Sequence, residues 1–488
     1  MSRTNREMSR RDFVAATGQV LVAGALAVAK EGPRERPASK RASFRAGAAA
    51  ANITPPLGVS LDGTIMQIGP ARHIHDELYA RCMVLDDGRT RVAIVVCDVT
   101  MISGTVFDKA KDLAQRQTGI PADHMLMSAT HTHMAPRVIG IGKGELDRQY
   151  DEFLTRRIAD AVTRAVNNLA PAKVAWGSAN EPQFVRNRRW IMKPGTVPAY
   201  PFGSQTEQAM MHGRPKKNRV KPAGPVDPEV SVVSLRHADG RPLAVLANYG
   251  IHYAAFKSGV VSSDYFGRFA EHVRRLLNAD DAEPPFVGIM SNGTSGDIGK
   301  PSGGLEAIRK VGDSLARTVA AVCKRIEHHN TLSLAIRERE LELGVRRPDE
   351  TRLRWARQLC SKAGGKKRLT RPEVYARETI ELSKFPRTVS LKLQALRIGD
   401  LGIVAIPCEV FAETGLAIKK GSPLKPTFVI ELANGYHGYL PTARQHELGG
   451  YETWAARSSY LEVQAESKIR ATVIDLLRAV ASSERGGS

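Results

Sequence analysis

The sequence predicts an α/β fold in which mixed sheets, built partly from hairpins, are covered by helices. Two observations lead to this class. Apolar runs of strand length are joined in pairs by Asp-Gly or Gly-Asp, and amphipathic patterns of helix length lie between these pairs. Hairpins join antiparallel strands and strand–helix–strand crossovers join parallel ones, so a chain that contains both builds a mixed sheet.

Three segments have the hairpin pattern. In each of them, two apolar runs flank a dipeptide that tolerates positive φ, which a tight hairpin turn requires. The turns are Asp87-Gly88 in YARCMVLDDGRTRVAIVVCDV, Asp239-Gly240 in VSVVSLRHADGRPLAVLANYGIH, and Gly399-Asp400 in VSLKLQALRIGDLGIVAIPCE. We therefore expect an antiparallel strand pair around each turn.

Helical patterns separate the hairpins. In YDEFLTRRIADAVTRAVNNL, apolar residues recur at steps of three and four, which is typical of a helix with one buried face. By this criterion, helices are predicted over residues 105–117, 151–168, 266–278, 303–327 and 463–483. A Pro/Gly/Lys-rich stretch at 203–228 is expected to form a long surface loop, and a polar insertion at about 345–388 is expected to be partly helical.

Composition bounds the class of protein. The 488 residues, with 42% hydrophobic and 25% charged side chains, are typical of a soluble globular protein and are ample for a large core. We expect residues 43–488 to form one domain. The five cysteines are scattered and include no Cys-x-x-Cys pair, so any metal must be held by nitrogen and oxygen.

The first 29 residues have the features of a twin-arginine export signal. Arg10 and Arg11 are followed by Phe13 and a short apolar stretch, and Ala27-Val28-Ala29 resembles a cleavage site. The apolar run is shorter than the stretch that a membrane-spanning helix needs. We expect residues 1–29 to direct export to the periplasm or the outside, residues 30–42 to be a linker, and the mature protein to begin after the signal.

The net charge is +21, and removal of residues 1–29, with four basic and two acidic side chains, leaves +19. Such a charge is compatible with an anionic membrane surface, an acidic polymer or nucleic acid. The basic runs lack interleaved aromatic residues, and only 6% of the chain is aromatic. Nucleic acid is therefore not expected as a partner, whereas peripheral contact with an anionic membrane stays open.

The stretch HMLMSATHTHMAPRVIG places two histidines at the end of an apolar run. In an extended strand, alternating residues share a face, so His131 and His133 are expected to point the same way. Neutral imidazole is a common metal ligand. The alternative is that one ring is a hydrogen-bonded core histidine and the other is solvated.

Other predicted strands also end in polar residues. In α/β sheets, ligands gather beyond the carboxyl ends of strands, where loops bring side chains from several strands together. The residues at these ends are Asp98, His131, His133, His252, Asn292, Glu409, Asn434, Tyr436 and Tyr439. Together they favour a metal site with two histidines and a carboxylate. Asp98 or Asp297 could hold a second, structural cation.

Several segments in combination carry a family resemblance. In chain order they are FRAGAAAANITPP, VVCDVTM, SATHTHMAP, ANYGIH, SNGTSGDIGKP, IPCEVF and NGYHGYLPT, the last followed by GGYETWAARS. This order resembles the catalytic N-terminal domain of the neutral/alkaline (non-lysosomal) ceramidase family over nearly the whole mature chain. The resemblance implies that family's catalytic fold, one zinc per chain, and hydrolysis of the amide of N-acylsphingosine.

The resemblance also implies the site residues. The family's zinc ligands, two histidines, a glutamate and a tyrosine, correspond to His131, His252, Glu409 and Tyr439. The implied catalytic residues are His133 for proton transfer or oxyanion stabilisation, Arg188 for stabilising negative charge, and Tyr451 near the reacting carbonyl. Such a ligand set would leave zinc Lewis-acidic and pull the pKa of bound water towards about 7.

The chain departs from the family pattern in two ways. Gly299 stands where the family has a serine regarded as catalytic, so an acyl-serine step at that position is excluded and direct attack by zinc-activated water is preferred. Ser295 could substitute, but a turn serine is the expected role because GTSGD is not a nucleophile elbow. The family's C-terminal β-sandwich domain is expected to have no counterpart here.

The sequence therefore favours an exported zinc-dependent hydrolase that cleaves an N-acyl amide, with N-acylsphingosine as one candidate among small amphiphilic substrates. Two alternatives stay open besides a serine hydrolase acting through Ser295. One is a zinc hydrolase of another class, acting on an ester or an amino-sugar amide. The other is a catalytically inactive binding protein that retains the metal.

Overall fold

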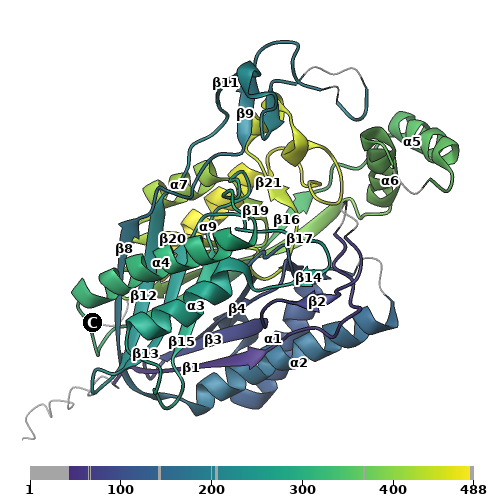
Figure 1. The fold of residues 1–488 in the computed structure, drawn as a ribbon. Coiled ribbons are helices and arrows are strands. Elements are labelled where there is room, and N and C mark those ends of the chain that lie inside the picture. The colour runs from purple at the N-terminus through teal and green to yellow at the C-terminus, as the bar shows by residue number, and fades with distance from the viewer. Residues whose placement is uncertain are drawn as a thin grey trace, which may run out of the picture. The chain divides into compact units, whose positions relative to one another are not determined.

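The computed structural model describes residues 43–63, 65, 68–140, 144–198, 200–203, 207–366 and 369–483. The predicted export signal at 1–29 and the linker at 30–42 lie outside these residues. Residues Arg41–Ser488 belong to one compact unit, whose described part is coloured in Figure 1. Among the described residues, no helix is both long enough and apolar enough to cross a membrane.

The larger of the two main sheets is mixed, as the sequence predicts. It has the strand order β15-β13-β12-β8-β1-β3-β4-β6, in which β13–β15 and β4–β6 are parallel pairs and the others are antiparallel. The strands are β1 (Arg45–Asn52), β3 (Tyr79–Asp86), β4 (Arg91–Cys97), β6 (Met125–Ala129), β8 (Ala170–Asn180), β12 (Glu229–His237), β13 (Pro242–Tyr249) and β15 (Val287–Asn292). The hairpins predicted at Asp87-Gly88 and Asp239-Gly240 are the pairs β3–β4 and β12–β13.

A second sheet packs face to face against the first. Its strands are β16 (Leu334–Gly344), β17 (Thr388–Ile398), β18 (Leu401–Ile406) and β20 (Thr427–Glu431), in that order. The turn at Gly399-Asp400 joins β17 to β18, which confirms the third predicted hairpin. Met83 and Ile94 of the first sheet and Leu396 and Phe428 of the second belong to one buried apolar cluster, so this cluster is the core between the sheets.

Helices cover the outer faces and give a helix–sheet–sheet–helix arrangement (Figure 1). They are α1 (Gly104–Thr118), α2 (Glu145–Asn167), α3 (Asp264–Leu276) and α4 (Leu305–Arg325) on the first sheet, and α7 (Ala412–Gly421) and α9 (Ala465–Ser482) on the second. The surroundings of strand β4 explain why its apolar run is continuous. Ile94 faces the core between the sheets, whereas Val95 faces α1 and α2, so both strand faces are buried.

The two predicted irregular segments contain regular structure. Within 203–228, β10 (Ala209–Met211) and β11 (Arg219–Pro222) pair with β9 (Arg189–Met192), so the expectation of a long loop is wrong in part. The insertion at 345–388 forms α5 (Glu350–Ala363) and α6 (Arg371–Ser383), as predicted, and Figure 1 shows this helical pair beside the sheets. The remaining elements are β2 (His73–Ile74), β5 (Met101–Ile102), β7 (Arg137–Val138), β14 (Val260–Val261), β19 (Glu409–Val410), β21 (Tyr439–Leu440), α8 (Ala443–Leu448) and the short 3-10 helices η1 (Ala122–His124), η2 (Lys216–Asn218) and η3 (Tyr451–Thr453).

The first sheet curls so that its two edges approach each other. β6 and β15 are the edge strands in the strand order, yet they contact each other, and both contact β20. A bridge between Ser128 and Ala433 ties β6 to the chain that follows β20. Twist accumulates across a sheet of this width. The loops that follow β6 and β13 consequently meet, although these strands lie far apart in the strand order.

Candidate metal centre

The segment after β6 positions His131 and His133. Strand β6 ends at Ala129, so the alternation of an extended strand, which the sequence suggested, is not what orients the two rings. Instead, His131 has a left-handed backbone with φ of 68°, and its N–H donates to the Val99 carbonyl at 3.1 Å. A left-handed non-glycine residue costs about 1–3 kcal/mol and is typical of functional sites. The two histidines still face one centre, with their Nε2 atoms 3.2 Å apart.

The His131 and His252 rings present nitrogen lone pairs to each other. His131 Nδ1 lies 2.8 Å from the Thr100 carbonyl, and His252 Nδ1 lies 3.2 Å from the Ser295 carbonyl. A carbonyl only accepts, so both Nδ1 atoms carry a proton, and the neutral form of each ring then has an unprotonated Nε2. These Nε2 atoms are 3.2 Å apart. Two acceptors at this distance repel unless a cation lies between them.

Glu409 adds a third acceptor to the same centre. Its Oε2 lies 3.4 Å from His131 Nε2 and 3.9 Å from His252 Nε2, and it has no hydrogen-bond partner although the residue is buried. Its Oε1 accepts a hydrogen bond from the Tyr436 hydroxyl at 3.0 Å, which fixes the carboxylate plane. The sequence placed Tyr436 at this edge but assigned it no role.

These atoms fit a tetrahedral metal ion. Zinc with ligands at about 2.0–2.1 Å keeps those ligand atoms roughly 3.3 Å apart. The His131–His252, His131–His133 and His131–Glu409 separations of 3.2, 3.2 and 3.4 Å all match that spacing. Imidazole nitrogen and carboxylate oxygen are also donors that zinc prefers. The residues present therefore fit the metal that the sequence predicts, and His131, His133 and His252 together form a cluster able to hold an ion.

His133 differs from the other two histidines. No backbone carbonyl among the described residues fixes its ring, which instead stacks on Tyr253 with centroids 4.0 Å apart. Burial, followed by the nearby His131, Arg137 and Arg188, lowers the pKa of His133, so the ring is neutral near pH 7. A neutral ring whose tautomer is free suits proton transfer better than fixed coordination.

Arg188 brings a buried cation to the cluster. Its Nη1 lies 3.3 Å from His252 Nε2, and its Nε donates to Glu452 Oε1 at 2.8 Å, while its buried Nη2 has no partner. Glu452 is fully buried and also pairs through Oε2 with Arg189 at 2.6 Å. Glu452 therefore orients Arg188 and compensates its charge. The sequence offered no sign of this role, because Glu452 lies 264 positions away.

Two tyrosines complete the wall. Strand β19 pairs in parallel with β21, and the register sets Glu409 opposite Tyr439. The Tyr439 ring lies 5.3 Å from the Arg188 guanidinium carbon and 5.8 Å from the Tyr451 ring. Burial, followed by the charge of Glu409, raises the pKa of both tyrosines, so both keep their proton near pH 7. All seven residues predicted from the sequence thus gather at one centre.

Gly299 and Ser295 occupy different positions. Gly299 borders the site, because a Cβ added to it would lie 3.3 Å from Arg188 Cβ. As expected from the sequence, this position carries no nucleophile. The Ser295 hydroxyl instead donates to Glu431 Oε1 at 2.5 Å, and its carbonyl orients His252. Ser295 is fully buried. These bonds give it a structural place behind the cluster.

The two aspartates considered for a second cation are engaged in the fold. Asp98 is fully buried and forms an ion pair with Arg81 through Oδ2, whereas its Oδ1 has no hydrogen-bond partner among the described residues. Asp297 accepts from Asn187 Nδ2 at 2.6 Å and from the Ala412 N–H at 2.9 Å. Burial raises the pKa of Asp297 to about 6, although these hydrogen bonds oppose the shift. Protein donors thus occupy both oxygens of Asp297.

The cavity at the cluster is narrow. It measures about 40 Å³ and is lined by His131, His133, Glu409 and the tyrosines at positions 436, 439 and 451. One water molecule occupies about 30 Å³ of liquid, so this space suits an ion and a reacting group. Tyr451 also lines a neighbouring cavity of about 350 Å³, and Tyr436 lines one of about 560 Å³. A larger substrate must therefore extend into neighbouring space.

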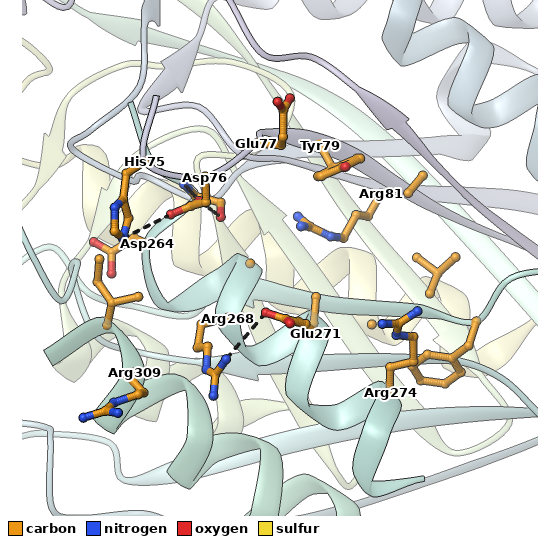
Figure 2. Close-up of a pocket in the computed structure, with 18 of the residues that line it drawn as sticks. His75, Asp76, Glu77, Tyr79, Arg81, Asp264, Arg268, Glu271, Arg274 and Arg309 are labelled. Carbon is orange, nitrogen blue, oxygen red and sulfur yellow. Dashed lines mark hydrogen bonds and ion pairs between the residues drawn. The ribbon is translucent and has the colours of Figure 1, made fainter. Parts of the chain in front are cut away.

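A larger cavity lies elsewhere. It measures about 710 Å³, is shown in Figure 2, and contains none of the predicted site residues. Charged side chains of both signs line it, and they pair with other protein groups, as Arg268 does with Asp313 and Glu77 with Asn52. No converging unpaired acceptors mark it. Among the described residues, the converging acceptors therefore lie at the histidine cluster and not in this larger cavity.

Comparison with known proteins agrees with the fold and the motifs. The sequence profile of the family described as neutral/alkaline non-lysosomal ceramidase, N-terminal, matches residues 44–329. The structure of neutral ceramidase from Pseudomonas aeruginosa is similar to this chain with a TM-score of 0.65 and 17% identity, covering 91% of this chain and 75% of that one. A ceramidase complexed with C2 matches with the same score and identity, over 91% and 76%.

Proposed function

Because this chain belongs to the neutral/alkaline non-lysosomal ceramidase family, we propose that it is a zinc-dependent hydrolase of N-acyl amides. The observation that carries the proposal is the convergence of three acceptors on one point. His131 Nε2, His252 Nε2 and Glu409 Oε2 lie 3.2–3.9 Å apart with no proton available between the two rings. Such a set is costly to bury without positive charge, which Arg188 supplies beside His252 and a bound cation would supply between the acceptors; we assign Tyr439 as the fourth ligand.

The remaining residues have roles that follow from their positions. Bound zinc would polarise the substrate carbonyl and lower the pKa of a coordinated water. His133 Nε2 can accept a proton from the attacking water and return it to the leaving amine. The unpaired Nη2 of Arg188 can donate to the oxyanion that develops on the carbonyl oxygen, and Tyr451 can donate to the same region.

This mechanism needs no nucleophilic side chain. Gly299 carries none, and the Ser295 hydroxyl is committed to Glu431 on the far side of His252. Direct attack by water therefore suits this chain better than an acyl-serine route. The substrate class follows from the family and from the cavities that flank the cluster, which have room for the two arms of an amide. N-acylsphingosine is one member of that class.

The proposal is tested by metal removal combined with substrate comparison. The full-length protein is assayed on a fluorogenic N-acyl amide and on the matched ester, before and after treatment with a chelator and after zinc is restored. We expect amide turnover to disappear with the metal and to return with zinc. Turnover that survives chelation would overturn the metal mechanism, and turnover of the ester alone would move the protein to another hydrolase class.

A further inference from the structure

The cavity next to Tyr451 contains buried polar atoms that the fold leaves unpaired. We call it the Trp454 pocket; it measures about 350 Å³ and is lined mainly by apolar side chains, among them Ile65, Val197, Met210, Leu369, Val374 and Trp454. Ile65 and Tyr451 also line the narrow cavity at the histidine cluster, so the two spaces adjoin. Helix α6, from the polar insertion, supplies one wall.

In this pocket, one carboxylate oxygen and one phenol hydroxyl lack hydrogen-bond partners among the described residues. Glu207 is 9% exposed; its Oε1 accepts from Trp454 Nε1 at 2.7 Å, whereas its Oε2 has no hydrogen-bond partner. Tyr375 is 3% exposed, and its hydroxyl also lacks a partner. Buried polar atoms are nearly always paired in native proteins. Two unpaired polar atoms in one pocket, next to the histidine cluster, indicate that these groups bind a ligand.

The charges around the pocket narrow the chemistry of that ligand. Arg371 lines the pocket, with its guanidinium 5.4 Å from the Trp454 ring, and disfavours a cationic group. The carboxylate of Glu207 disfavours an anionic one. A neutral hydroxyl suits both kinds of unpaired atom, because it can donate to a carboxylate oxygen and accept from a phenol. The volume lies near the lower end of the range for ligand pockets, about 300–1,000 Å³, so the group that enters is compact.

We propose that the Trp454 pocket binds a compact, hydroxyl-bearing apolar arm of the substrate, with Glu207 and Tyr375 as specificity-determining residues. The inference rests on the proposed amide hydrolysis for the identity of the molecule that carries this arm. It adds that the enzyme distinguishes an amide with a hydroxyl near the scissile bond from the same amide without it.

Three amides that differ by one hydroxyl test the proposal: N-octanoyl ethylamide, N-octanoyl ethanolamine and N-(2-hydroxyoctanoyl) ethylamide. The hydroxyl is absent from the first, on the amine side in the second and on the acyl side in the third. For the wild type we expect one hydroxylated compound to have a kcat/KM about tenfold higher than the ethylamide, which corresponds to one net hydrogen bond. The favoured compound also shows which arm enters.

The variant Tyr375→Phe removes only the unpartnered hydroxyl. We expect it to keep or raise the melting temperature and to abolish most of the tenfold preference; Glu207→Gln is expected to weaken the preference as well. Tyr150→Phe is the matched control, because the Tyr150 hydroxyl is buried but donates to the Ile53 carbonyl at 2.8 Å outside the pocket. It should lower the melting temperature and leave the preference unchanged.

Binding measured by thermal shift with the same three amides separates this proposal from the proposed function. No preference for either hydroxylated amide in turnover or binding, or a preference that survives both pocket variants, would overturn the pocket assignment even if amides are hydrolysed. A hydroxyl-dependent thermal shift that Tyr375→Phe abolishes would uphold the pocket even if none of the three amides is cleaved, in which case the hydrolase proposal alone fails.

Discussion

At the scale of single residues, the metal-binding capacity of the histidine cluster depends on which nitrogen of each ring carries the proton. Carbonyl groups of Thr100 and Ser295 hold the protons of His131 and His252 at Nδ1, so the Nε2 atoms meet as acceptors. Glu409 joins them with an oxygen that has no other partner. Backbone carbonyls thus orient the ligands before any metal binds, which lowers the conformational cost of coordination.

Glu452 is expected to act on catalysis by positioning Arg188. Glu452→Gln leaves Arg188 and Arg189 with a neutral partner in a buried site, so we expect a loss of about 3 kcal/mol in the free energy of unfolding. Metal content should be retained, and kcat should fall at least tenfold with a smaller change in KM. These quantities are measured by denaturant unfolding, metal analysis and steady-state kinetics.

The matched control for Glu452 is Asp86→Asn, which weakens another carboxylate–arginine pair, with Arg91, at the end of β4 opposite to the segment that carries His131. This control should lose stability and keep kcat. Equal losses of kcat in the two variants would show that Glu452 acts only through stability.

Ser295 is expected to support the site and not to attack the substrate. Ser295→Ala leaves the buried Glu431 carboxylate short of one donor, so we expect a loss of about 1–3 kcal/mol in unfolding free energy, with turnover within tenfold of wild type. Ser128→Ala is the control, because the Ser128 hydroxyl is buried without a partner, and stability should not fall. A folded, metal-loaded Ser295→Ala protein with no turnover would instead identify a serine nucleophile.

The sequence predicted which residues form the site better than it predicted how the backbone orients them. The strand-end residues and the family resemblance named His131, His133, His252, Arg188, Glu409, Tyr439 and Tyr451, which the fold brings together. The left-handed turn at His131 could not be predicted, because nothing in THTH distinguishes it from an extended strand end. Glu452 was missed because its partners are remote in the chain.

At the scale of elements, turn chemistry was the most informative part of the sequence. The dipeptides Asp87-Gly88, Asp239-Gly240 and Gly399-Asp400 each form the predicted hairpin, since local φ requirements determine a tight turn. The small sheet of β9, β10 and β11 was missed because its strands are only three or four residues long. Close packing of helices on strands depends instead on small residues such as Gly288.

Gly288 lets helix α3 approach β15 closely. A Cβ at this position would lie 2.8 Å from Ala270 Cα and 2.9 Å from its carbonyl oxygen, so Gly288→Ala must displace backbone. We expect unfolding free energy to fall by about 1–3 kcal/mol, as measured by denaturant titration. Gly365→Ala, where the added Cβ meets nothing within 4 Å, should change it by less than about 0.5 kcal/mol. Equal effects of the two substitutions would contradict this packing.

At the scale of the whole described unit, the curl of the first sheet creates the site. It brings the loops after β6 and β13 together, with β20 in contact with both sheet edges. Local pattern predicts strands and turns but not this closure, which depends on contacts between segments far apart in the chain. The same packing also buries several histidines outside the cluster. Because these rings are harder to protonate in the fold than in the unfolded chain, the stability of the fold depends on pH.

Stability should fall in acid because buried neutral histidines must remain uncharged in the fold. Burial lowers the pKa of His437 to about 4 and that of His446 to about 3, the latter helped by Arg346 and Arg189. Unfolded histidine titrates near 6.5, so the unfolded chain binds more protons below that pH. Unfolding free energy should therefore decrease as pH falls from about 6.5 towards 4.

The variant His446→Gln should reduce this pH dependence by up to one proton, or about 1.4 kcal/mol per pH unit. Denaturant unfolding of metal-free protein across this range measures the slope without interference from metal release. Identical slopes for the variant and the wild type would show that His446 does not take part.

The most direct test of the account is the zinc content of single-residue variants. Purified wild type, His131→Ala, His252→Ala and Glu409→Ala are compared with His133→Ala, the control that removes a neighbouring imidazole of the same cluster. We predict about one zinc per chain in the wild type and in His133→Ala, the latter without turnover, and none in the other three. Wild-type protein without zinc, or retention of zinc by all three ligand variants, would contradict the account.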